Sequence, residues 1–271
     1  MTCIIHDIPI NYEEYGEGKP VLCIHGYWVD HRLMSECLEP VFDQKHGYRR
    51  IYIDLPGMGK TPSAEWIKDS YDVLGIVKEF INVIIADENF LIAGESYGGY
   101  LTLGIIYDMC ERIDGVMLIC PVVANTRKNL PLRNILHKSE ALESIYDKNR
   151  VKTFLEIAVM ATTKTYEKYK SSILAGIEIA DMEFLSELYD KAFDFENKFK
   201  DKKFCKPACI LTGRQDHLVG YKDTFEILDK FPRATFAVLD CSGHNLQIEN
   251  ELLFNDHVKD WIWRVELEEM K

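Results

Sequence analysis

Basic residues are the scarcer charge in this 271-residue chain, which has 32 Lys and Arg against 44 Asp and Glu. The resulting net charge of -12 repels nucleic acid and anionic membrane surfaces at long range, so we expect neither as a partner. We expect a small organic substrate instead. The composition does not indicate an oligomeric state.

Long hydrophobic runs are also missing. A membrane-spanning helix needs about 20 consecutive apolar residues, and no run in the chain approaches that length. Residues 1–7 show no basic segment followed by a long apolar one, which a signal peptide would need. The sequence therefore predicts a cytoplasmic protein.

Clustered metal ligands are absent as well. The eight cysteines are scattered, and Cys205 and Cys209 stand close enough for half of a metal site, but no His/Cys pair elsewhere has matching spacing. Four of the eight lie in or next to apolar runs, which is typical of buried, reduced thiols. We predict neither a metal nor a cofactor.

What the chain does have is a regular alternation of short apolar runs and stretches with helical spacing. This order predicts an α/β protein whose mostly parallel sheet is covered by helices on both faces. A helix is expected to close the chain over 248–267. The expected strands form a hairpin over 3–15 and then lie at 21–24, 50–54, 91–94, 115–121, 207–213 and 235–239.

The alternation stops between residues 122 and 204, where no run rich in β-branched residues is found. This stretch predicts a helical insertion, or cap, over the end of the sheet. We therefore divide the chain into a core of residues 1–121 and 205–271 and a cap of residues 122–204. The helices expected in the cap cover 133–146, 151–160, 165–178 and 183–199.

Ser96 stands between Gly94 and Gly98 in the spacing Gly-x-Ser-x-Gly. An apolar run precedes it and a helix-forming run follows it, which is typical of a nucleophile elbow, a strained turn that presents the serine hydroxyl above the sheet. Glycines are needed beside such a turn because strand and helix cross closely there. The triplet alone is weak evidence, so the other strand ends must support it.

Two further polar residues follow later strands. Asp216 comes just after the strand that ends at Gly213, and His244 follows the last expected strand. Because parallel strands end at one edge of a sheet, we expect both near Ser96. A serine hydroxyl is a poor nucleophile and needs a base such as His244, whose tautomer an acid such as Asp216 would fix. The chain order serine, acid, histidine matches this arrangement.

Acyl transfer at Ser96 would also need two donors for the tetrahedral oxyanion. We predict the backbone N–H groups of Tyr97, directly after the serine, and of Tyr27, on the loop after strand 21–24. Trp28 is a candidate wall of the acyl pocket, with ordinary core packing equally open. His25 is expected to brace the same loop.

Three other polar residues lie near the expected site. Glu95 could contact it, but its side chain is expected to point off the other side of the elbow. His217 and Asp240 are interpreted as structural, the first because it is adjacent to Asp216 and the second because it ends a strand.

With these residues in place, the chain resembles the α/β-hydrolase superfamily, and specifically its small, carboxylesterase-like serine hydrolases with a helical cap. The resemblance implies an eight-stranded sheet, a cap after the sixth strand, and catalysis by Ser96, Asp216 and His244 with donors at Tyr27 and Tyr97. It also implies that the loop 54–60 is structural. The segments that carry it are His-Gly-Tyr-Trp at 25–28, Asp-Leu-Pro-Gly-Met-Gly at 54–59, Gly-Glu-Ser-Tyr-Gly-Gly at 94–99, Gly-Arg-Gln-Asp at 213–216 and Ser-Gly-His at 242–244.

Departures from related patterns narrow the expected reaction. Ser96 stands where haloalkane dehalogenases and epoxide hydrolases carry aspartate, which argues against both. The loop at 25–28 lacks the Ser-Gly-Pro-Gly run frequent in hydrolases that cleave carbon–carbon bonds of ring-fission products, so that reaction is second choice. We expect hydrolysis of a small ester, thioester or lactone through an acyl-enzyme on Ser96. A cofactor-free perhydrolase and a hydrolase-fold ligand receptor remain open.

Overall fold

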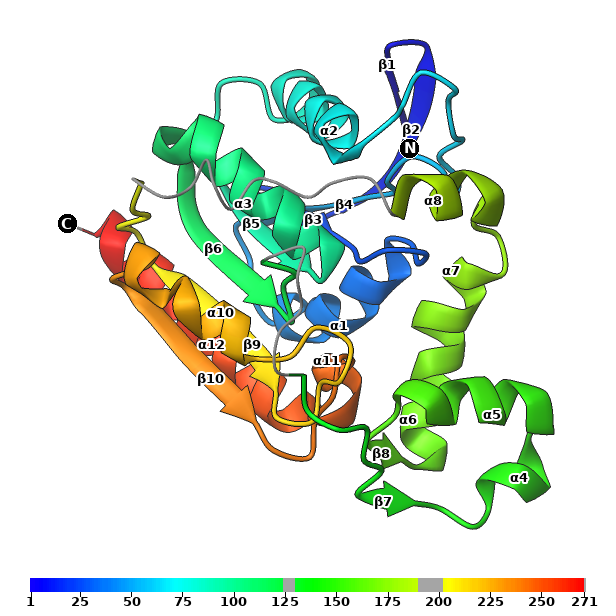
Figure 1. Cartoon of the computed structure of the whole chain (residues 1–271). Helices are drawn as coiled ribbons and strands as arrows, with labels where there is room; N and C mark the ends of the chain where they lie inside the picture. Colours follow the sequence, from blue (N-terminus) through cyan, green and yellow to red (C-terminus); the bar gives the residue numbers. More distant parts are fainter. Residues whose placement is uncertain (124–129, 190–201, 271) are drawn as a thin grey trace.

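The computed structural model describes residues 1–123, 130–189 and 202–270. Its main sheet has eight strands in the order β1-β2-β4-β3-β5-β6-β9-β10 (Figure 1). The β1–β2 and β2–β4 pairs are antiparallel and the other five pairs are parallel, which confirms the predicted sheet. The strands are β1 (Thr2–Ile5), β2 (Ile8–Tyr15), β3 (Lys19–Ile24), β4 (Tyr48–Ile53), β5 (Phe90–Glu95), β6 (Ile113–Ile119), β9 (Ala208–Gly213) and β10 (Ala234–Leu239).

Helices cover both faces of this sheet (Figure 1). Along β3, Leu22 and Ile24 pack into the core on the side of α2 and α3, whereas Val21 and Cys23 pack into the core on the side of α1 and α12. Successive strand residues point to opposite faces, so a run buried on both faces must be apolar throughout. The covering helices are α1 (Arg32–Phe42), α2 (Ser70–Ile84), α3 (Tyr97–Met109), α10 (Lys222–Glu226) and α12 (Glu251–Glu269).

The last helix expected from the sequence, over 248–267, is divided into two helices. α11 (Leu246–Glu249) and α12 are separated at Asn250, whose φ of -133° and ψ of 57° are not helical.

Over the described residues, no helix combines the length and apolar character that crossing a bilayer would require.

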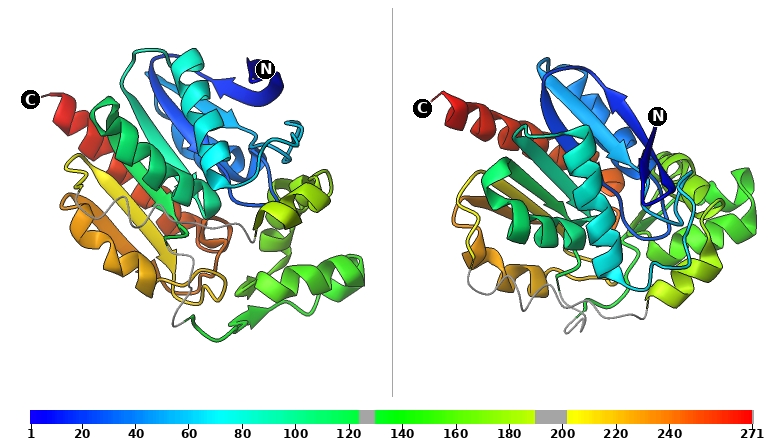
Figure 2. Two further views of the ribbon diagram at one scale, coloured as in Figure 1. Left: turned by 45° about the horizontal axis from the view of Figure 1, so that its top comes forward. Right: turned by 90° about the horizontal axis from the view of Figure 1, so that it is seen from above.

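Residues 130–189, between β6 and β9, lie beyond the carboxyl ends of the strands, as the three views in Figures 1 and 2 show. We call residues 122–204 the insertion segment. Its described part has a small apolar core of its own, which includes Leu142, Phe154 and Tyr166 and is completed by Leu33 of α1. Its elements are β7 (His137–Lys138), α4 (Leu142–Ile145), α5 (Lys148–Ile157), β8 (Met160–Ala161), α6 (Thr163–Tyr169), a π-helical stretch (Lys170–Leu174), α7 (Ala175–Ile177) and α8 (Met182–Tyr189).

The helix expected over 133–146 is wrong. Only α4 is helical there, and the preceding residues pair with β8: the N–H groups of Leu136 and Ser139 donate to the carbonyl oxygens of Val159 and Ala161, at 2.9 and 2.8 Å. Backbone groups satisfied by this distant partner have no need of a helix. The helices expected at 151–160 and 165–178 are α5 and the run from α6 to α7, and the one at 183–199 is α8 as far as Tyr189, with 190–199 outside the described residues.

At Gly98, α3 approaches the end of β3 closely. A Cβ atom added to Gly98 would lie 2.1 Å from the carbonyl oxygen of Ile24 and 2.7 Å from that of His25. One added to Gly94 would lie 2.4 Å from the Gly98 oxygen. The glycines around Ser96 are therefore required by backbone contact between the strand, the loop and the helix.

Gly98→Ala should consequently lower the free energy of unfolding by about 3 kcal/mol or more, because overpacking costs about 1–3 kcal/mol even where flexible side chains can yield. Gly75→Ala is the matched control: nothing lies within 4 Å of an added Cβ in the middle of α2, so alanine should raise stability by up to about 1 kcal/mol. Urea unfolding of both variants measures the difference. Equal midpoints would contradict the close approach.

Candidate active site

Ser96 occupies the sharp turn between β5 and α3, with a φ of 51° and a ψ of -111°. A positive φ at a non-glycine residue costs about 1–3 kcal/mol and persists only where the surroundings impose it. Here the Ser96 N–H donates to the Ile119 oxygen at 2.9 Å, and the Ser96 oxygen accepts from the Val122 N–H at 3.0 Å. Two bonds to the end of β6 and the chain after it thus hold the turn.

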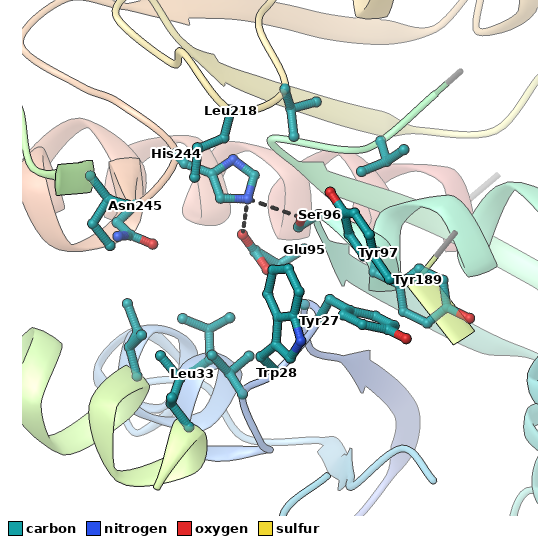
Figure 3. A pocket seen from close by; sticks show the side chains of 17 residues that line it. Tyr27, Trp28, Leu33, Glu95, Ser96, Tyr97, Tyr189, Leu218, His244 and Asn245 are labelled. Carbon is teal, nitrogen blue, oxygen red and sulfur yellow. Dashed lines mark hydrogen bonds and ion pairs between the residues drawn. The ribbon is translucent and has the colours of Figure 1, made fainter. Parts of the chain in front are cut away.

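His244 connects Ser96 to Asp216. It lies on the loop between β10 and α11, and its Nε2 is 2.9 Å from the Ser96 Oγ, while its Nδ1 is 2.9 Å from the Asp216 Oδ2 (Figure 3 shows the first contact). The three side chains singled out in the sequence therefore come together from three strand ends. The distances are those of hydrogen bonds.

Asp216 is fully buried and makes a second set of bonds through its other oxygen. Its Oδ1 accepts from the N–H groups of Leu218 at 2.9 Å and Val219 at 3.0 Å. Burial alone would raise the pKa of Asp216, but the His244 ring and these two N–H groups outweigh it, so the pKa lies below its ordinary value. The carboxylate is ionised at neutral pH and faces the Nδ1 side of the ring.

His25 braces the loop after β3, as expected. Its Nε2 accepts from the Leu55 N–H at 3.0 Å, so its Nδ1 carries the proton and donates to the Gly26 oxygen at 2.7 Å. Burial lowers the pKa of His25, which keeps the ring neutral. The Gly26 carbonyl shares a peptide with the Tyr27 N–H, and in a trans peptide the two groups point in opposite directions, so the Tyr27 N–H is turned away from His25.

The loop after β4 is held by Asp54. Its Oδ1 accepts from the His31 N–H at 2.9 Å, and its Oδ2 accepts from the Lys60 N–H at 2.9 Å and from the Asn11 side chain at 2.7 Å. These contacts give Asp54 a role in closing the loop, away from the pocket that Ser96 faces.

Glu95 departs from the sequence expectation, because its side chain points into the site. It is 2% exposed, and its Oε1 lies 3.4 Å from the His244 Nε2 (Figure 3). Alternation along β5 puts Glu95 on the same face as Leu91 and Ala93, the face that α12 covers. His244 directly precedes α11 and α12, which lie on that same face of the sheet. The two-residue period of β5 could therefore have predicted the contact between Glu95 and His244.

The pocket in front of Ser96 has a volume of about 390 Å³, within the usual range for small-molecule sites of about 300–1,000 Å³. Most of its walls are apolar, and none of the described residues that line it is a lysine or arginine. His217 and Asp240 are not among them. The lining residues are Gly26, Tyr27, Trp28, Val29, Leu33, Glu95, Ser96, Tyr97, Val122, Ile157, Ile173, Ile177, Tyr189, Leu218, Val219, His244 and Asn245.

Trp28 and Tyr27 join the loop after β3 to the insertion segment. The Trp28 ring stacks on Tyr189 of α8, with centroids 5.0 Å apart and planes 23° apart. The Tyr27 hydroxyl donates to the Leu185 oxygen at 2.8 Å. The insertion residues in the pocket, such as Tyr189, have no sequence motif that could have indicated them.

Comparisons with known proteins agree with this architecture. The family described as serine aminopeptidase, S33, matches residues 19–251. A pimeloyl-[acyl-carrier protein] methyl ester esterase from Legionella pneumophila (strain Corby) is 31% identical over 93% of this chain and 99% of its own. A 2-hydroxy-6-oxononadienedioate/2-hydroxy-6-oxononatrienedioate hydrolase from Paraburkholderia phymatum is 23% identical over 94% of this chain and 91% of its own.

A solved structure extends the likeness to three dimensions. The alpha/beta superfamily hydrolase from Oenococcus oeni PSU-1 superposes with a TM-score of 0.88 at 29% identity, covering 95% of this chain and 96% of its own. The family match spans both parts of the sheet and the chain between them. The chain therefore belongs to the serine aminopeptidase S33 family of the α/β-hydrolase superfamily.

Proposed function

We propose that this protein is a serine hydrolase that cleaves a small carboxylic ester, or the related thioester or lactone, through an acyl-enzyme on Ser96. The observation that carries the proposal is the chain of two 2.9 Å contacts from Asp216 through His244 to the Ser96 hydroxyl. A serine is activated when a base lies within hydrogen-bond reach of its hydroxyl and a buried acid orients that base.

In the first half of the reaction, the Ser96 Oγ attacks the carbonyl carbon while the His244 Nε2 takes its proton. Asp216 keeps the Nδ1 proton in place and stabilises the imidazolium. The backbone N–H groups of Tyr97 and Tyr27 are proposed to bind the oxyanion. Tyr97 begins α3, where the N–H groups lack intrahelical acceptors and the helix dipole favours negative charge.

Collapse of the tetrahedral intermediate breaks the bond to the alcohol, which receives the proton from the His244 Nε2. In the second half, a water molecule gives its proton to the same nitrogen and attacks the acyl carbon. The acid is released and the proton returns to the Ser96 Oγ. Every step uses one nitrogen of one residue, so the position of the His244 ring controls both halves.

The pocket favours an uncharged, largely apolar acyl group. Its described walls offer no cation, and the one buried carboxylate, Glu95, would repel an anionic substrate. We also propose that the insertion segment is the cap that encloses this group, because Ile157, Ile173 and Tyr189 line the same pocket as Ser96. Differences in the cap would then determine which acyl groups fit.

Cleavage of a carbon–carbon bond is the second candidate, supported by the Paraburkholderia relative. The substrate in that relative's name is a dioate, and a dicarboxylate entering this pocket would place a carboxylate among apolar side chains. Burying an unpaired carboxylate costs several kcal/mol. The described lining therefore favours the ester reaction.

A matched pair of substrates tests this choice. The p-nitrophenyl ester of an unbranched six-carbon acid should be hydrolysed with a kcat/KM at least about 100-fold above that of the mono-p-nitrophenyl ester of the six-carbon dicarboxylic acid, since about 1.4 kcal/mol corresponds to a factor of ten. Release of p-nitrophenol measures both. Equal rates, or a preference for the acid-bearing ester, would contradict an uncharged acyl group.

A further inference from the structure

Glu95 is a buried carboxylate that faces the same nitrogen of His244 as the Ser96 hydroxyl does. Its Oε1 is 3.4 Å from the His244 Nε2, and its Oε2 lies so close to Gly26 that a Cβ added there would be 2.2 Å away. Figure 3 shows the Glu95 carboxylate beneath the His244 ring. The proposed roles of acid, base and nucleophile account for Asp216, His244 and Ser96 but leave Glu95 without a role.

The groups around Glu95 come from several elements. His244 reaches it from the loop after β10 and Asp216 from the loop after β9, and the buried thiols of Cys37 on α1 and Cys120 after β6 also interact with its charge. Among the described residues, only the His244 ring and the Gly26 backbone favour the ionised form of Glu95. The described residues therefore give the Glu95 carboxylate one titratable partner of opposite charge, the His244 ring.

We propose that Glu95 is a positioning residue that governs the proton at the His244 Nε2. In its ionised form it stabilises the imidazolium that develops while Ser96 attacks, from the side opposite Asp216. In its protonated form it donates a hydrogen bond to Nε2 and competes with the Ser96 hydroxyl for the lone pair that must accept the serine proton. This inference rests on the proposed function of Ser96.

Glu95 changes its protonation state within the pH range of the labelling experiment. Burial, the largest influence, raises the pKa of Glu95 to about 7, against the opposing effects of the His244 ring and the Gly26 backbone. Acylation requires an unprotonated His244 to accept the Ser96 proton and, by this proposal, an ionised Glu95, so a proton taken up by either group slows it. The two groups interact, so their apparent pKa values belong to the pair. The acid limb of the pH profile should therefore be steeper than one proton allows.

The test is the second-order rate of labelling by a fluorophosphonate between pH 5 and 9, followed by intact mass. In the wild type, the logarithm of the rate should fall with a slope approaching two on the acid side. Glu95→Gln fixes a neutral donor beside Nε2, so it should label about tenfold more slowly at pH 8, the factor that one pKa unit of coupling represents, and its slope should be one.

Two variants complete the experiment. Glu95→Asp keeps an ionisable group and should restore most of the rate and the steep slope. Glu88→Gln removes the same charge from the exposed loop before the opposite end of β5 and should match the wild type. A labelling rate and slope unchanged in Glu95→Gln would overturn the inference. A wild-type slope of one would overturn it as well, and this measurement does not depend on whether Glu95→Gln folds. Failure of the wild type to label would instead overturn the proposed function.

Discussion

Replacing Ser96 by alanine should lower ester hydrolysis by a factor on the order of 10⁶, which is the loss typical when a serine nucleophile is removed from such a constellation. Without the Oγ, no acyl-enzyme can form, and His244 has no proton to accept. Intact-mass spectrometry after exposure to a fluorophosphonate measures the loss directly: the wild type should gain one adduct and Ser96→Ala none. Hydrolysis of p-nitrophenyl esters should disappear in parallel.

The backbone at Ser96 supplies a control for folding. Alanine inherits the positive φ of 51°, whereas glycine adopts such values without strain. Ser96→Gly should therefore be equally inactive but at least as stable as Ser96→Ala in thermal unfolding. Full turnover by either variant would contradict the assignment of the nucleophile. A wild type that binds esters tightly but neither labels nor turns over would favour a receptor.

Asp216→Asn should lower kcat by about 10⁴, an effect known for this change at a serine hydrolase acid. The reason is that the two carboxylate oxygens of Asp216 have different partners. The Oδ1 accepts N–H groups from Leu218 and Val219, so the amide oxygen of asparagine must take that place. Its NH₂ then faces the His244 Nδ1, which can no longer carry a proton. The proton moves to Nε2, and the ring cannot accept one from Ser96.

Asp240→Asn is the matched control for this change. Asp240 is an exposed residue directly after β10, and its Oδ1 accepts from the Gln215 side chain at 2.8 Å. The substitution should change kcat less than about twofold, because surface changes away from the reacting groups have small effects. Steady-state kinetics and thermal unfolding of both variants separate catalysis from folding. A loss at Asp240 comparable to that at Asp216 would mean that the wrong acid has been identified.

The sheet and the meeting of Ser96, Asp216 and His244 could be predicted because both depend on local pattern and one general rule. Apolar runs with strand length fixed the eight strands, and the gathering of ligands beyond the carboxyl ends of parallel strands brought the three residues together. Glu95 was misplaced only because the two-residue period of β5 was not followed to its last residue.

The insertion segment could not be predicted in the same way. β7 and β8 consist of two residues each, and His137 pairs with Met160, which is 23 positions away. Such short strands carry no periodicity, and their pairing depends on tertiary contacts rather than on local propensity. The same holds for the pocket residues from α5 to α7, because their position depends on how these elements pack against Val29 and Leu33.

The route by which the chain leaves and rejoins the sheet has an evolutionary consequence. β6 and β9 are hydrogen-bonded neighbours, and the Cys120 N–H donates to the Leu211 oxygen at 2.8 Å. The connection leaves the sheet after Ile119 and rejoins it at Ala208, on two strands that are paired with each other, and doubling a connection's length costs only about 0.6 kcal/mol. Descendants can therefore exchange or resize this part without altering the residues proposed to react, which fits relatives that match nearly the whole chain yet are named for ester and for carbon–carbon substrates.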